Sequence, residues 1–137
     1  MHEALDILEV LPATRRIAVL GDMLEIGKFT EHSHRAVGDK VAKFADILFA
    51  VGPRARFIAD EASTRGIDRK SRKLEENQIF IFDNPSEAGK KLDEIIKAGD
   101  LILVKGSQSM RMEKVVEEIM AEPELKTKLL VRQDWKN

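Results

Sequence analysis

The chain has 137 residues, enough for one domain with its own hydrophobic core, and its composition (43% hydrophobic, 34% charged, 5% aromatic) is that of an ordinary globular protein. With 23 basic against 24 acidic side chains and few aromatic rings, it lacks the basic, stacking surface of a nucleic-acid-binding protein. It has no cysteine, no apolar run approaching the roughly 20 residues that cross a membrane and no signal-peptide pattern, so we expect a cytoplasmic protein without disulfides or thiolate chemistry.

The first half of the chain is predicted to alternate helix and strand. In order, the elements are a helix at about 3–11, a strand at Ile17–Leu20, a helix capped by Thr30, a strand at Ile47–Val51 and a helix beginning at Pro53. Threonine suits a helix N-cap and proline suits the first helical position. The apolar face of the second helix continues through Phe44 and Ala45. The charged segment 63–78 is predicted to be a solvated loop.

The second half continues the alternation. It holds a strand at Ile79–Phe82, a helix from Asn84 to Gly99, a strand at Leu101–Val104 and a helix whose apolar face is Met112, Val115, Val116, Ile119 and Met120. Asn84, followed by proline and then by glutamate at the third helical position, is a helix-start signal. The four strands do not alternate polar and apolar residues, so each is expected to be covered on both faces. The tail 122–137 could add a short helix after Pro123 and a fifth strand at 129–131.

This alternation predicts an α/β fold: a three-layer, Rossmann-like single domain over residues 1–137, with a mostly parallel sheet and helices on both faces. The carboxyl ends of parallel strands share one edge, where such sheets bind ligands. The segments predicted along this rim are Gly21-Asp22-Met23, Gly52-Pro53, Asp83-Asn84 and Lys105-Gly106-Ser107. The rim could bind an anion at its helix N-termini, but the same residue types also form plain strand-to-helix turns.

Each rim residue has more than one interpretation. Asp22 either holds a ligand ammonium or hydroxyl group, or is a turn or capping carboxylate. Lys105, at the end of a buried strand, could meet an anion, extend to solvent or pair with Asp22. Gly106 and Ser107 fit an anion-binding nest or a helix entry, and Arg111 either points to the rim or is solvated.

No complete catalytic centre is visible in the sequence. His32 and His34 do not share a helix face and have no third ligand nearby, so no metal site is predicted, and His34 is interpreted as a partly exposed or capping histidine. Met110 and Met112 fit the core better than a cofactor contact. The chain contains no Walker A loop, dinucleotide-binding glycine pattern or Ser-His-Asp arrangement.

Two motifs, in the same order, resemble the C-terminal domain of the Mur ligases of peptidoglycan synthesis. The first is Leu-Gly-Asp-Met-Leu-Glu-Ile-Gly at 20–27, in which Ile26 replaces the leucine usual in the family. The second is Lys-Gly-Ser at 105–107, followed by Met-Arg-Met-Glu at 110–113. The resemblance runs from Met1 to about Ala121 and is strongest to the branch that adds D-alanyl-D-alanine.

The resemblance implies that the chain is the third domain of a three-domain, ATP-dependent ligase. Such an enzyme joins D-Ala-D-Ala to UDP-N-acetylmuramoyl-tripeptide in cell wall biosynthesis, with ATP and Mg²⁺ bound mainly in the central domain and the UDP-sugar in the N-terminal domain. Met1 would then be an internal methionine, and the chain alone would be inactive. We expect a monomer whose partners are those two domains and the substrates, without nucleic acid or membrane.

The resemblance also implies roles for the rim residues. Lys105, Gly106 and Ser107 would face the central domain and help to position the substrate or the transferring phosphate. Asp22 and Met23 would line the dipeptide side, and Arg111 would hold the dipeptide carboxylate. His34, Asp83 and Asn84 are lesser candidates.

A receiver-like phosphoacceptor module is the alternative interpretation. Its length, its doubly wound sheet and its strand-end Asp83 and Lys105 fit this chain. Two features count against it: Asp22 stands alone where an acidic pair is expected, and Gly106 stands where that family places proline.

Overall fold

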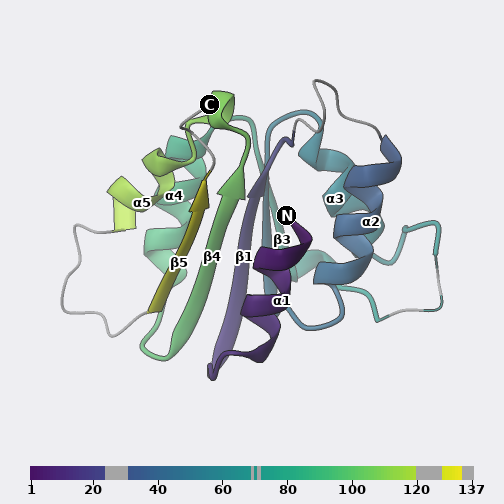
Figure 1. Ribbon diagram of the computed structural model, residues 1–137, viewed down its shortest axis with the longest axis horizontal. Helices are drawn as coiled ribbons and strands as arrows, with labels where there is room; N and C mark the ends of the chain where they lie inside the picture. The colour runs from purple at the N-terminus through teal and green to yellow at the C-terminus, as the bar shows by residue number, and fades with distance from the viewer. Residues whose placement is uncertain (24–30, 69, 71, 120–127, 134–137) are drawn as a thin grey trace.

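Strands and helices alternate along the chain, as the apolar runs predict (Figure 1). The computed structural model describes residues 1–23, 31–68, 70, 72–119 and the backbone of 128–133. The helices are α1 (His2–Val10), α2 (Glu31–Val41), α3 (Ala55–Ala62), α4 (Pro85–Ile95) and α5 (Glu113–Ile119). The strands are β1 (Arg15–Gly21), β2 (Ile47–Val51), β3 (Ile79–Phe82), β4 (Asp100–Gly106) and β5 (Lys128–Gln133).

The five strands form one sheet in the order β3-β2-β1-β4-β5, and every neighbouring pair is parallel. In the centre of the sheet Ile17 of β1 lies between Ile47 of β2 and Ile102 of β4. The strand order reverses direction between β1 and β4. In a doubly wound sheet this switch point is where the carboxyl edge opens to a ligand.

Successive residues of the central strands supply two separate cores, one on each face of the sheet. On one face Ala18, Leu20 and Leu48 pack in a cluster with buried residues of α1, α2 and α3. On the other face Val19 and Phe49 pack in a cluster with residues of α4 and α5. The three layers are visible in Figure 1, where α4 and α5 lie on the left of the sheet and α2 and α3 on its right. The predicted three-layer fold is confirmed.

Strand β3 departs from the prediction that every strand is covered on both faces. It ends the sheet and pairs only with β2. Its side chains are therefore only partly buried, and Ile81 is 45% exposed. A fully apolar run can thus also form an edge strand, which the residue pattern alone does not distinguish from a central one.

Two helix limits were predicted wrongly. Helix α2 ends at Val41, whereas its apolar pattern continues to Ala45. The residues beyond it form a turn, in which the Ala45 N–H donates to the Val41 carbonyl at 2.9 Å. Ala45 is therefore outside the helix, although its side chain is buried as the apolar pattern predicts. Helix α4 ends at Ile95, and Gly99, with φ of 93°, lies in the turn that leads into β4.

Other limits are confirmed. Asn84 caps α4, since its Oδ1 accepts the Glu87 N–H at 2.9 Å, and Pro85 is the first helical residue. The fifth strand exists and is parallel to β4. The predicted N-cap Thr30, the helix position Met120 and the helix after Pro123 lie outside the described residues.

Segment 63–78 is not simply a solvated loop, because it packs on the buried carboxylate of Glu61. Its Leu74 is fully buried, and Lys73 Nζ lies 3.2 Å from Glu61 Oε2. The backbone N–H groups of Ile67 and Asp68 donate to the same carboxylate at 3.0 and 2.8 Å. Burial would raise the pKa of Glu61, but these hydrogen bonds and the lysine outweigh it and lower the pKa to about 2.

We therefore expect Glu61→Gln to destabilise the chain in a pH-dependent way. A carboxylate with a folded-state pKa of about 2 and an unfolded value near 4.3 stabilises the fold above about pH 4.3, and this stabilisation is lost as the pH falls toward 2. The variant should lose about 3 kcal/mol at pH 7, and the difference from wild type should shrink below pH 4. Urea unfolding between pH 7 and pH 3 measures this, with the exposed Glu76→Gln as control. An equal loss at every pH would contradict the account.

Candidate functional site

The carboxyl end of β1 is tied to two other elements through Asp22. Its backbone carbonyl accepts the N–H of Ser107, the residue after β4, at 2.9 Å. Its carboxylate Oδ1 accepts the N–H groups of Arg54 and Ala55, where α3 begins, at 2.9 and 2.7 Å. Asp22 is only 6% exposed. The structure thus favours the capping interpretation of Asp22 over the ligand-binding one.

The next residue ties β1 to a third element. The N–H of Met23 donates to Nε2 of His34 on α2 at 3.1 Å. The side chain of Met23 packs in the core beside α1 to α3 and is 7% exposed, which contradicts the predicted substrate-facing position for that side chain. His34 is fully buried, so its predicted partial exposure is wrong. We call Asp22 and Met23 the β1 junction.

The start of α3 is shaped by the junction. Gly52 has φ of 105°, and a Cβ on it would lie 2.6 Å from Asp22 Oδ1, so only glycine lets the carboxylate approach. The helix begins at Ala55, after an N-cap Arg54 whose own side chain makes no cap hydrogen bond. Pro53 was predicted at the first helical position, and this is wrong because Asp22 caps the helix from the end of another strand.

Lys105, Gly106 and Ser107 lie on the opposite side of the switch point, at the end of β4. Lys105 is half-buried, and strand alternation from Leu103 places it on the α1 to α3 face, the same face as the Asp22 carboxylate. A Cβ on Gly106 would lie 2.8 Å from Met112 Cγ, so Met112 packs closely between the ends of β1 and β4. Met112 is fully buried, which confirms its predicted core position.

Arg111 stands out because its backbone is left-handed, with φ of 54° and ψ of 47°. Among the described residues it is the only one other than glycine with positive φ. Met110 and Met112 on either side pack into the core beside α4 and α5, while the Arg111 side chain is 65% exposed and bonds Glu113 at 2.7 Å. Such strain persists where the surroundings fix it, often at binding sites.

Two predicted rim residues do not join this group. Asp83 follows β3, two strands from β1 and so about 10 Å along the sheet. Its side chain is 82% exposed and pairs with Arg56 at 3.1 Å. Asn84 is occupied as the cap of α4. Both lie on the predicted edge, but the strand order separates them from the switch point.

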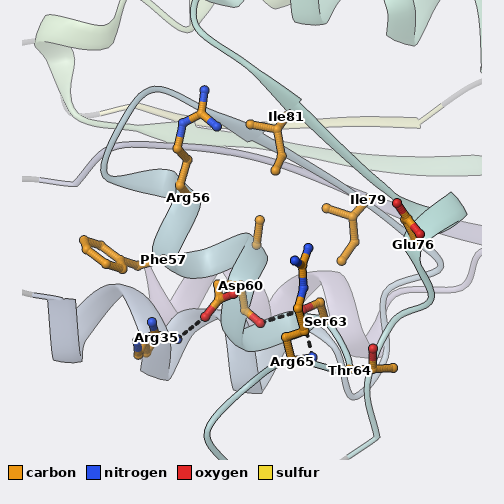
Figure 2. A pocket seen from close by; sticks show the side chains of 11 residues that line it. Arg35, Arg56, Phe57, Asp60, Ser63, Thr64, Arg65, Glu76, Ile79 and Ile81 are labelled. Carbon is orange, nitrogen blue, oxygen red and sulfur yellow. Dashed lines mark hydrogen bonds and ion pairs between the residues drawn. The ribbon is translucent and has the colours of Figure 1, made fainter.

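A groove of about 830 Å³ runs along the outer edge of β3. Figure 2 shows Ile79 and Ile81 along one wall and Phe57 and Asp60 of α3 on the other, with Asp60 held by Arg35 at 2.7 Å. No motif predicted this groove, because its walls come from α2, α3 and β3 and from both ends of segment 63–78. It shares no residue with the β1 junction.

The described part of the chain offers no metal site and no membrane span. No group of three or more His, Asp or Glu side chains there could hold a metal ion. None of the helices described is long and apolar enough to cross a bilayer. The candidate site is the switch point between β1 and β4, where the β1 junction meets the segment 105–107 and, a few residues further on, Arg111.

A parallel sheet in this order, with its polar residues at the β1/β4 switch point, defines a doubly wound α/β domain. The family model described as Mur ligase, glutamate ligase domain, matches residues 1–108, and the chain belongs to this family.

Full-length relatives agree with this assignment. The UDP-N-acetylmuramoyl-tripeptide–D-alanyl-D-alanine ligase of Bacillus subtilis (strain 168) is 29% identical over 129 residues, 90% of this chain and 26% of that protein. The ligase of the same name from Synechocystis is 32% identical over 123 residues, 89% of this chain and 25% of that protein. The crystal structure of the Thermotoga maritima MurF ligase in complex with ADP matches 90% of this chain and 25% of its own, with a TM-score of 0.66 and 24% identity, and supports the fold. The chain spans about a quarter of the length of these relatives.

Proposed function

We propose that this chain serves as the C-terminal domain of an ATP-dependent ligase that joins D-Ala-D-Ala to UDP-N-acetylmuramoyl-tripeptide in cell wall biosynthesis. The observation that carries the proposal is the family match over residues 1–108. The names of the relatives supply the substrates. Since the chain spans about a quarter of those proteins, its partners would be the remaining domains of a monomeric, cytoplasmic enzyme.

In the proposed reaction ATP phosphorylates the tripeptide carboxylate to give an acyl phosphate and ADP. The amine nitrogen of D-Ala-D-Ala then attacks the carbonyl carbon, the bond to phosphate breaks, and the amine loses a proton as the amide forms. Water would destroy the acyl phosphate, so the site must be closed before it forms. The described residues do not fit a magnesium site, and the proposal leaves Mg²⁺ to the central domain.

The geometry supports different roles for the two sides of the switch point. Lys105, Gly106 and Ser107 would face the central domain, where a lysine can balance the charge of the transferring phosphate. Arg111 would hold the dipeptide carboxylate, for which a bidentate guanidinium is suited. Asp22 would act by fixing the start of α3 and the position of Ser107, since its carboxylate and carbonyl are already bonded there.

The receiver-like alternative does not fit the sheet. That fold has the strand order 2-1-3-4-5, in which the third strand is internal. Here β3 is an edge strand, and the order is β3-β2-β1-β4-β5. Asp83 at its end is therefore an exposed edge residue, away from Lys105 on β4.

Arg111→Gly should separate the effect of the left-handed backbone at this residue from the effect of its guanidinium group. Glycine relieves the left-handed backbone, so the melting temperature should equal or exceed that of Arg111→Ala, which keeps the strain. Both variants lack the guanidinium, so in the full-length ligase both should raise the KM for D-Ala-D-Ala by a similar factor. An unchanged KM in both would remove Arg111 from the dipeptide site.

The proposal requires that this domain cannot work alone. With ATP, D-Ala-D-Ala and the UDP-tripeptide present, the 137-residue chain should release no ADP, and calorimetry should detect weak or no ATP binding. Steady turnover by the chain itself would refute its role as a closing domain.

A further inference from the structure

We propose that His34 is a positioning residue for this site: its neutral imidazole fixes the peptide unit between Asp22 and Met23, and through that unit the backbone of Ser107. This inference rests on the proposed function, because it names a residue that positions backbone groups of the proposed site. It starts from one hydrogen bond, from the Met23 N–H to His34 Nε2 at 3.1 Å.

That hydrogen bond determines the state of the imidazole. The Met23 N–H is a donor, so Nε2 must be unprotonated, and the proton of the neutral ring lies on Nδ1. The ring is 0% exposed, so bulk water does not compete for the Met23 N–H at this position. Without an acceptor the buried N–H would lose a hydrogen bond on folding, which is costly.

The position of His34 on α2 is otherwise a core position. Val37 and Val41, on the same helix face, are apolar and almost fully buried. A leucine at 34 would continue this face and would bury no polar atom. An imidazole here breaks the local pattern, and such departures are expected where a residue serves a site.

One planar peptide unit links His34 to the other side of the switch point. The Asp22 carbonyl and the Met23 N–H belong to the same peptide bond, which is rigid and, as no cis bond occurs among the described residues, trans. Its oxygen accepts from Ser107 at 2.9 Å, and its N–H donates to His34 at 3.1 Å. A trans peptide points these two groups in opposite directions, so the unit bridges α2 and the segment after β4. Without the hydrogen bond to His34 the peptide plane can tilt, which moves the Asp22 carbonyl that accepts the Ser107 N–H.

His34 would therefore affect catalysis without touching the substrate. Small displacements of positioned groups can reduce rates by up to about a hundredfold. Since Ser107 belongs to the segment that faces the transferring phosphate, the effect should fall on kcat. The KM for the UDP-tripeptide, assigned to other domains, should not change.

The test uses three variants of the full-length ligase. His34→Leu removes the acceptor at similar volume, His34→Gln restores an acceptor oxygen near the Nε2 position, and Val41→Ala destabilises the same helix away from the junction. We expect His34→Leu to lower kcat about ten- to a hundredfold, His34→Gln to retain kcat within about threefold, and Val41→Ala to lower only the melting temperature. A wild-type kcat in His34→Leu, or equal loss in folded His34→Gln and His34→Leu, would overturn the proposal.

A second measurement does not depend on activity or on the variants folding. Nitrogen-15 NMR of wild-type histidines reports the tautomer, and we expect His34 with its proton on Nδ1 at pH 7. A proton on Nε2 would overturn the proposal. If the wild-type full-length protein shows no ligase activity, the proposed function fails, while the NMR result still decides the state of His34.

Discussion

Asp22→Ala is expected to lower the free energy of unfolding of this chain by about 2–3 kcal/mol, the largest single-residue effect at the switch point. The substitution removes the acceptor for the N–H groups of Arg54 and Ala55, and Ala55 is fully buried. It also removes a negative charge from the N-terminus of α3, where the helix dipole favours one. Urea unfolding of the chain measures the change.

Two variants make this prediction specific. Asn84→Ala deletes an exposed helix cap in the same fold and should cost only about 1 kcal/mol. Asp22→Asn keeps an oxygen at Oδ1 and should recover most of the stability lost in Asp22→Ala. If Asp22→Ala costs no more than Asn84→Ala, Asp22 does not hold α3 in the way the distances indicate.

Lys105→Ala should have the largest effect on activity, lowering kcat of the full-length ligase about a hundredfold or more. The ammonium is proposed to balance charge that develops on the transferring phosphate, and alanine cannot replace it. The melting temperature should change little, because Lys105 is only half-buried near the carboxyl end of β4.

The control for Lys105 is Lys114→Ala, an exposed lysine on α5, which should leave kcat unchanged. Turnover by Lys105→Ala at the wild-type rate, with the protein folded, would place Lys105 outside the site. A raised KM with unchanged kcat would instead assign it to substrate binding, contrary to the role proposed.

The sheet could be predicted because buried parallel strands consist of short runs of apolar residues. All four of the predicted runs form strands. Two of the strands, β1 and β4, are longer than predicted at both ends, and the residues missed at their starts are charged. Arg15 of β1 and Asp100 of β4 are register partners joined by an ion pair of 2.7 Å, and Asp100 is 1% exposed. A charge at a strand start suggests a loop unless its partner, here 85 positions away, is known.

The residues of the candidate site could be predicted to lie at one edge of the sheet, but their roles could not be assigned. The rule that ligands meet the carboxyl edge correctly placed Asp22 beside Ser107. Whether Asp22 meets a ligand or a helix depended on amides more than 30 residues away, which no local pattern encodes. The role proposed for His34 had a signal in the sequence, since His34 shares a helix face with Val37 and Val41 and is the polar member of that buried face.

This domain is proposed to complete a ligase that acts on D-Ala-D-Ala. The most direct test incubates the full-length protein with ATP, UDP-N-acetylmuramoyl-tripeptide and D-Ala-D-Ala, and measures the products by mass spectrometry and phosphate release. We expect the UDP-linked pentapeptide with one phosphate released per amide formed, and no product when the region of residues 1–137 is deleted. Absence of the pentapeptide with the intact protein, or its formation without this region, would contradict the account.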